Sequence, residues 1–217
     1  MKLNPRTTQI LKNFASINPS LQFDEGQNLK TISPNKTVMA QAKLDDVIPR
    51  TFAIYDLSRF LGVVSLFEDP SFNFEDTQVN LSSAGRKVSY TYADPSTIIT
   101  PPNKEIDIGN VDVEVEINQE VFAEIMKAMG VLGFSEVVLV GEDGKLKLRA
   151  TDTKNPSADN FDVELGDTNM TFSAVFKSEN LKIIPANYTV RITSRGISHW
   201  SADDVEYWIS IESNSEF

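Results

Sequence analysis

The side chains that could perform acid–base or metal chemistry are few, and they do not stand at catalytic spacing. His199 is the single histidine; it could serve as a general base, but it has no motif partner, so we expect a strand-end or surface role. The acid pairs Asp45-Asp46 and Asp203-Asp204 could bind a cation, yet adjacent strand residues point to opposite faces. The chain has no cysteine, phosphate-binding glycine loop, His-Glu-x-x-His or nucleophile elbow. The sequence therefore predicts no catalytic residue, metal site or cofactor.

The composition is that of an ordinary globular chain with a strong acidic balance. The 217 residues are 41% hydrophobic and 24% charged, and the net charge is −11. We find no apolar run long enough to span a membrane and no apolar core of a signal peptide. The absence of cysteine fits a cytoplasmic location best. An acidic chain argues against nucleic-acid binding. Residues 1–23, however, contain Lys2, Arg6 and Lys12 and no acid, which predicts a locally basic helix on an acidic body.

Four segments have helical periodicity. Residues 4–17 place apolar side chains on one face, with Asn4 as the cap and Lys12 on the opposite face. Residues 118–132 repeat this arrangement with Lys127 in the equivalent position. Two shorter helices are expected near 56–67, with Arg59 outward, and over 177–184, ending before Pro185.

The second half of the sequence echoes the first in the order of its elements. In each half a helix is followed by a glycine turn and alternating strands, then by a second helix and more strands. The three prolines of segment 93–104 disfavour both a helix and a central strand there. We therefore predict an α+β fold made of a duplicated domain, each half with two helices and antiparallel sheets. The first domain would span 1–92, an extended connector 93–105 and the second domain 106–217.

This combination of features resembles the sliding clamps of DNA replication, and the amino-acid sequence is similar to that of the clamps of T-even-type bacteriophages. The matching stretches span nearly the whole chain: Met1-Lys2-Leu3, Leu11 to Asn18, Ala53 to Leu57 with Phe60-Leu61-Gly62, Ala93 to Thr97, Pro102-Asn103-Lys104 and the terminal Phe217. Each stretch is weak by itself, and their specificity lies in the set.

The resemblance implies a ring of three subunits whose helices line a hole for duplex DNA and whose sheets form the outer wall. Such a ring tethers the replicative DNA polymerase, is opened by an ATP-driven clamp loader, and has no cofactor of its own. In T-even relatives it also serves late transcription factors, and the setting would be the cytoplasm of the infected bacterial host. Sequence-independent phosphate contacts would come from cations on or near the helices, namely Lys2, Arg6, Lys12, Arg59, Lys127, Lys177 and Lys182. The alternative for Lys12, Arg59 and Lys127 is that they belong to ordinary solvated helix faces.

Ring closure requires strand edges that pair head to tail. The candidates are strand 86–92, with Val88 and Tyr90, and strand 160–166, with Phe161 and Val163, unless both are internal strands. A partner's apolar peptide would insert near Ile98 and Ile99, which could equally anchor the connector.

Two other classes of function remain open at this point. A non-catalytic, β-rich viral structural or adaptor protein would share the duplication but show no dependence on DNA. A hydrolase that uses carboxylates around His199 is the weakest reading, because no residues are spaced for it.

Overall fold

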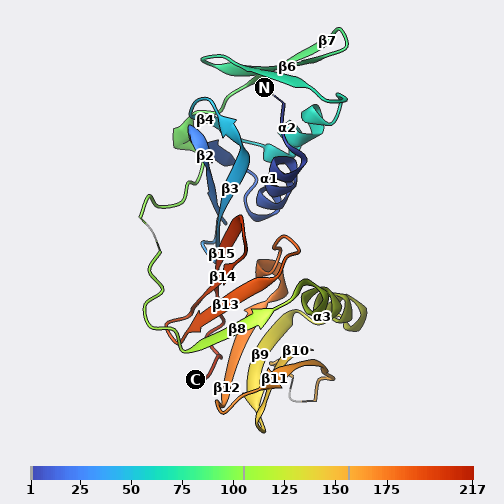
Figure 1. Ribbon diagram of the computed structural model, residues 1–217, viewed down its shortest axis with the longest axis vertical. Helices are drawn as coiled ribbons and strands as arrows, with labels where there is room; N and C mark the ends of the chain where they lie inside the picture. Colours follow the sequence, from blue (N-terminus) through green and yellow to red (C-terminus); the bar gives the residue numbers. More distant parts are fainter. Residues whose placement is uncertain (1, 105, 156) are drawn as a thin grey trace. The chain divides into compact units, whose positions relative to one another are not determined.

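The structure is a computed structural model that describes residues 2–104, 106–155 and 157–217. The chain divides into two compact units, Met1–Lys104 and Glu105–Phe217, each of which combines antiparallel sheet with α-helix, α1 and α2 in the first and α3 in the second (Figure 1). The predicted mixed α+β fold with antiparallel sheets is therefore confirmed.

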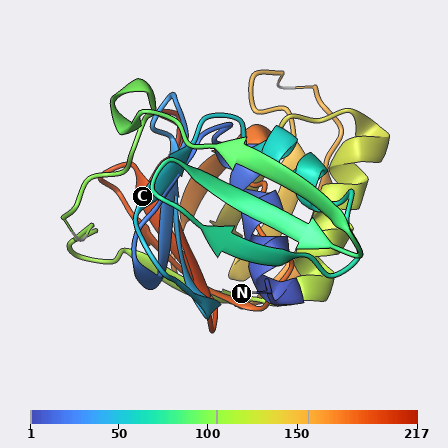
Figure 2. The ribbon, with the colours of Figure 1, turned by 90° about the horizontal axis from the view of Figure 1, so that it is seen from above.

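The described residues of unit 1 form two α-helices and seven strands. Its elements are α1 (Pro5–Ile17), β1 (Leu21–Phe23), β2 (Gly26–Ile32), β3 (Val38–Ile48), β4 (Phe52–Ile54), α2 (Leu57–Val64), β5 (Ser71–Phe74), β6 (Gln78–Ser83), β7 (Arg86–Thr91) and a 3-10 turn (Pro95–Thr97). Strand β1 pairs with β4, β2 pairs with β3, and β5, β6 and β7 form a three-stranded sheet that Figure 2 shows face on. The buried face of α1, with Ile10, Leu11 and Phe14, packs against β2 and β3.

Unit 2 contains one long helix and eight strands among its described residues. Its elements are β8 (Val113–Ile117), α3 (Gln119–Leu132), β9 (Glu136–Glu142), β10 (Lys145–Thr151), β11 (Phe161–Asp167), β12 (Phe172–Lys177), a 3-10 turn (Ser178–Asn180), β13 (Tyr188–Thr193), β14 (Ile197–Ser201) and β15 (Val205–Ser210). One sheet has the order β11-β10-β9-β12, and α3 packs on β10 and β11. In the other sheet β13 lies between β8 and β14, and β14 also pairs with β15.

Trp200 is the centre of the unit 2 core. Its side chain is 1% exposed, and its indole N–H donates to Ser198 Oγ at 3.0 Å. The rings of Phe122, Phe176 and Tyr188 meet it edge on, with centroids 5.6–5.9 Å away. This geometry is the favoured one for aromatic pairs, so α3, β12 and β13 are joined through one side chain.

The fourth expected helix, over 177–184, is wrong. Only Ser178–Asn180 forms a 3-10 turn, because Lys177 still belongs to β12. Leu181, Ile183 and Ile184 are each buried as the chain crosses to β13, whereas a helix would present one face to the core and another to solvent. The apolar content of this segment therefore anchors a crossing loop.

Candidate functional site

The long helix of each unit presents one lysine on the side away from its core. On α1, Asn4 Oδ1 accepts a hydrogen bond from the backbone N–H of Arg6 at 2.8 Å and sets the helix start, and Lys12 is exposed. On α3, Asn118 Oδ1 accepts from Val121 N at 2.8 Å, and Lys127 is exposed in the same way. Both caps follow the predicted pattern. The fold therefore gives each unit a helix with an outward cation.

The other predicted cations differ in how their charges are engaged. Lys2 forms an ion pair with Asp69, and the Arg6 guanidinium donates to Gln9 Oε1 at 2.8 Å. Lys177 Nζ lies 3.1 Å from Glu212 Oε2, and the hydrogen bond to this carboxylate raises the pKa of Lys177. Lys182 is exposed just beyond the 3-10 turn. Within the described residues, Lys12, Arg59 and Lys127 enter none of the ion pairs, which leaves their charges to solvent or a ligand.

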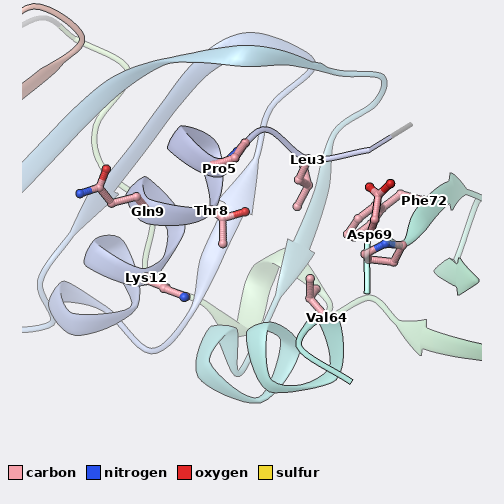
Figure 3. A pocket seen from close by; sticks show the side chains of 9 residues that line it. Leu3, Pro5, Thr8, Gln9, Lys12, Val64, Asp69 and Phe72 are labelled. Atoms are coloured by element: carbon pink, nitrogen blue, oxygen red, sulfur yellow. The ribbon is translucent and has the colours of Figure 1, made fainter. Parts of the chain in front are cut away.

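Helices α1 and α2 pack side by side and leave an open pocket of about 420 Å³ beside Lys12 (Figure 3). Leu3, Val64 and Phe72 supply apolar wall, and Asp69 stands across the pocket from the lysine. The lining of this pocket is therefore mixed, with a cation and a carboxylate beside apolar side chains.

Arg59 lies in a different hollow from the pocket beside Lys12. It lines a groove of about 390 Å³ beside β7, together with Tyr55, Asp56 and Tyr90. The Tyr90 hydroxyl donates to the Asp56 carbonyl at 3.2 Å, and the ring meets Phe60 edge on at 5.1 Å. Burial, and then the Asp56 carboxylate, raise the pKa of Tyr90, so the phenol stays protonated and available as a donor. The structure thus brings together Arg59 and Tyr90, which were predicted for different roles.

Sequence reasoning missed Tyr55, which lines this groove and is 67% exposed. A usable signal was present. Phe52, Ala53 and Ile54 are all buried, and the chain then turns into α2 through the exposed Tyr55 and the helix cap Asp56. An aromatic residue at such a boundary indicates a contact surface more than a core position.

Strand β11 shows one apolar face and one charged face. Phe161 and Val163 are half-buried beneath α3, whereas Asp162 and Glu164 are exposed. Arg149 Nε lies 2.7 Å from Asp162 Oδ1, and Lys145 Nζ lies 2.7 Å from Glu164 Oε1. Sequence reasoning missed this charged ladder, although the alternation of Lys145 and Arg149 with apolar residues in one strand was its signal.

The segment around Ile98 and Ile99 is tied to unit 1 through the backbone. The Asn18 amide donates to the Ile99 carbonyl at 3.3 Å and to the Ile32 carbonyl at 2.8 Å. The Ile98 side chain is half-buried, and that of Ile99 is 45% exposed. A fixed backbone with a part-exposed apolar side chain is compatible with both of the predicted roles.

His199 lies within β14, where its ring stacks on Trp208 with centroids 4.9 Å apart. Its Nε2 is 3.1 Å from Glu206 Oε2. Asp46 accepts the Asn4 backbone N–H at 2.7 Å, a structural contact. In the described part of the chain no group of acids and histidines could hold a metal ion, and no helix is long and apolar enough to cross a membrane.

Both units of the chain match known protein families. Residues 2–100 match the family described as DNA polymerase processivity factor, and residues 114–213 match the C-terminal family of the gp45 sliding clamp. The sliding clamp of Vibrio phage KVP40 is 32% identical over 98% of this chain and 99% of its own. The sliding clamp of Enterobacteria phage T4 is 30% identical over 99% of this chain and 98% of its own.

Solved clamps share the fold. A PCNA from A. fulgidus, bound to the C-terminal region of FEN-1, superposes with a TM-score of 0.70 at 12% identity over 96% of both chains. The Helicobacter pylori beta clamp bound to a DNA ligase peptide gives 0.72 at 14% identity, over 98% of this chain and 65% of that one. These matches do not favour the structural or adaptor alternative. The chain belongs to the sliding-clamp family, the non-catalytic processivity factors that keep a DNA polymerase on its template.

Proposed function

We propose that three copies of this chain close head to tail into a ring around duplex DNA and that the ring holds the polymerase by topology. The domains would be 1–92 and 106–217, with 93–105 as their connector. The observation that carries the proposal is that each unit offers one helix with an outward lysine and one sheet ending in an edge strand with half-buried apolar residues, β7 in unit 1 and β11 in unit 2. Two different surfaces on one chain let each copy bind the next head to tail, and the assembly closes into a ring when the rotation between copies allows it.

The cations proposed to face DNA are, first, Lys12 and Lys127, because they are exposed and outside the ion pairs. Lys2, Arg6, Lys177 and Lys182 would add positive charge nearby, and Arg59 would contribute from the groove beside β7. Three chains of charge −11 carry about −33 in total, which repels a polyanion at long range. At physiological salt the Debye length is about 8 Å, so DNA in the hole would sense mainly the cations next to it.

Few contacts of this kind imply weak direct affinity and fast sliding, because phosphate contacts are independent of sequence. Retention would then depend on closure of the ring. Opening it around DNA would require an ATP-driven loader, since the sequence has no phosphate-binding loop.

The polymerase would bind through a short apolar peptide placed beside Ile98 and Ile99. Support comes from the part-exposed Ile99 on a backbone held by Asn18, and from the FEN-1 region and ligase peptide bound in the two solved clamps. The loader and late transcription factors would be further partners. The site of action would be the cytoplasm of a bacterium infected by the phage.

Retention by topology is testable with the labelled chain and its loader. The loader, supplied with ATP, places the chain on a nicked circular duplex, and the circle is then cut once with a restriction enzyme. We expect the chain to remain on the circle through gel filtration and to be lost after linearisation. Equal retention on circular and linear DNA would show direct affinity and overturn the proposal.

A further inference from the structure

The buried side chain of Asn18 stands at the end of helix α1. The residue is 2% exposed, has an extended backbone, and its N–H donates to the Phe14 carbonyl at 2.9 Å. Its side-chain Nδ2 donates to the carbonyls of Ile32 and Ile99, and its Oδ1 accepts from the backbone N–H and the hydroxyl of Ser20. One amide therefore joins the end of α1, the start of β1, the end of β2 and the connector.

The partners of this amide fix its orientation. A backbone carbonyl can only accept and a backbone N–H can only donate, so Nδ2 faces Ile32 and Ile99 while Oδ1 faces Ser20. An aspartate would keep the bonds from Ser20 but would turn a carboxylate oxygen toward two carbonyls. A serine has one hydroxyl in place of the two N–H groups. The complete set of bonds therefore requires the amide of asparagine.

The second unit shows that ending such a helix does not require a side-chain amide. Helix α3, the counterpart of α1, ends at Gly133, whose left-handed backbone (φ 71°) lets its N–H donate to the Met129 carbonyl at 2.9 Å. This common type of cap uses no side chain. The amide of Asn18 accordingly does more than end its helix, and its partners outside the helix indicate what it does.

The connector has few hydrogen bonds to the body of unit 1. At its start the Ala93 N–H donates to the Ala53 carbonyl at 2.8 Å. Residues 94–98 then bond among themselves, in and around a 3-10 turn. In the described part of the connector, the bond from Asn18 to Ile99 is therefore the one hydrogen bond after Ala93 that reaches the body.

The bond at Ile99 determines how the connector presents its apolar side chains. Ile98 has an extended backbone (φ −116°, ψ 155°), and successive side chains of an extended segment point to opposite sides. Ile98 is half-buried and Ile99 is 45% exposed, in agreement with this alternation. Because a carbonyl and a side chain leave the same backbone in fixed directions, a carbonyl held by Asn18 keeps the Ile99 side chain outward.

We infer that Asn18 is the positioning residue of the partner-peptide site. This inference rests on the proposed docking of an apolar peptide beside Ile98 and Ile99. Because Asn18 is buried, it acts through the connector and does not touch the peptide. It holds the connector in the conformation that the peptide needs, so the connector loses little freedom when the peptide binds.

The test measures binding of the phage DNA polymerase to the chain in the absence of DNA and loader. A fluorescent label on Thr100→Cys, at an exposed position of a chain without cysteine, reports the mobility of the connector by its anisotropy. Titration with the polymerase gives the Kd. In Asn18→Ala we expect the label to become more mobile and the Kd to rise about fivefold, as for the loss of one ordinary hydrogen bond.

Three further variants assign the effect to the Nδ2 donors. Asn18→Asp keeps the bonds from Ser20 and loses the donors, so it should weaken binding as Asn18→Ala does. Ser20→Ala removes one bond on the acceptor side and should leave the Kd within about twofold. Ser33→Ala is the matched control for stability, because its buried hydroxyl accepts the N–H groups of Thr37 and Val38 and, in the described residues, has no bond to the connector. It should lower the urea midpoint as Asn18→Ala does and leave the Kd unchanged.

A double-mutant cycle with Ile99→Ser tests whether Asn18 acts through Ile99. In the Ile99→Ser background, Asn18→Ala should raise the Kd by less than about twofold, because the side chain that it positions is already absent. An equal rise in both backgrounds, or an equal rise in Ser33→Ala, would mean that Asn18 supports the fold in general and would overturn the inference.

The remaining outcomes separate this inference from the proposed peptide site. If Ile99→Ser weakens binding and Asn18→Ala does not, the positioning role is wrong and the site beside Ile98 and Ile99 stands. If Ile99→Ser leaves the Kd unchanged, the polymerase binds elsewhere, and both the site and the role of Asn18 are overturned.

Discussion

The double variant Lys12→Glu/Lys127→Glu changes the two helix cations that the proposed ring turns toward DNA. Both side chains are exposed and lie outside the ion pairs of the described residues, so we expect the free energy of unfolding to change by less than about 0.5 kcal/mol. The matched control is Lys43→Glu/Lys154→Glu, one exposed lysine in each unit on a strand or loop. Both variants lower the net charge of the chain equally, from −11 to about −15.

The size of the effect follows from counterion release. Each phosphate contact contributes about 0.9 to the dependence of log affinity on log salt. If the duplex in the hole contacts one Lys12 and one Lys127 at a time, the variant loses two phosphate contacts. The slope of log affinity against log salt then becomes shallower by about 1.8. Between about 50 and about 200 mM salt this amounts to about a twelvefold difference in salt sensitivity.

The assay is ATP-dependent loading of the labelled chain onto a primed duplex, followed by primer extension, at both salt concentrations. We expect the helix variant to load less at low salt, to depend less on salt and to give shorter products, while the control behaves as the unchanged chain does. If the helix variant and the control lose the same amount, net charge is responsible and the assignment of these helices to the DNA is wrong.

Three predictions concern stability. Trp200→Ala should lower the free energy of unfolding by about 3–5 kcal/mol in urea titrations, because it empties the centre of the unit 2 core, and a loss below about 1 kcal/mol would contradict the packing. Arg149 holds the pKa of Asp162 below its ordinary value of 3.8, so the pair stabilises the fold above that pH, and the stabilisation is lost as pH falls through the lowered pKa. In thermal unfolding measured over a range of pH, Arg149→Met should therefore make the melting temperature fall less steeply as the pH is lowered. Gly141→Ala should destabilise by about 1–3 kcal/mol, since a Cβ there would clash with the backbone carbonyl of Met170 and lie 2.8 Å from a ring carbon of Phe172. Gly62→Ala, with open space on a helix, should stabilise by up to about 1 kcal/mol.

Local patterns predicted the elements that have strong local causes. The helices α1 and α3 follow from their periodicity and from Asn4 and Asn118 as caps, whose side chains accept the predicted hydrogen bonds. The hairpin β9–β10 follows from strict alternation around a glycine turn. In these segments helix or strand propensity, hydrophobic pattern and packing agree. Under this condition the structure of a segment can be predicted from its own residues alone.

The failures concern residues whose surroundings come from distant parts of the chain. Residues 177–184 are apolar enough for a short helix, but β12 extends through Lys177. The residues that follow form the 3-10 turn and the loop to β13. Arg59 lies on the outside of its helix as its position in the helical pattern predicts, yet it faces the groove beside β7 because the β5-β6-β7 sheet lies next to α2. Which strand becomes an edge is likewise a property of the whole sheet, so identifying β7 and β11 as edge strands required the topology.

The mass of the chain in solution tests the ring most directly. Light scattering over a dilution series should find a species of three times the 24.2 kDa chain at high concentration, which dissociates on dilution as expected for short strand-edge joints. A mass of one chain throughout, at concentrations well above those of the loading assay, would contradict the ring and remove the mechanism built on it.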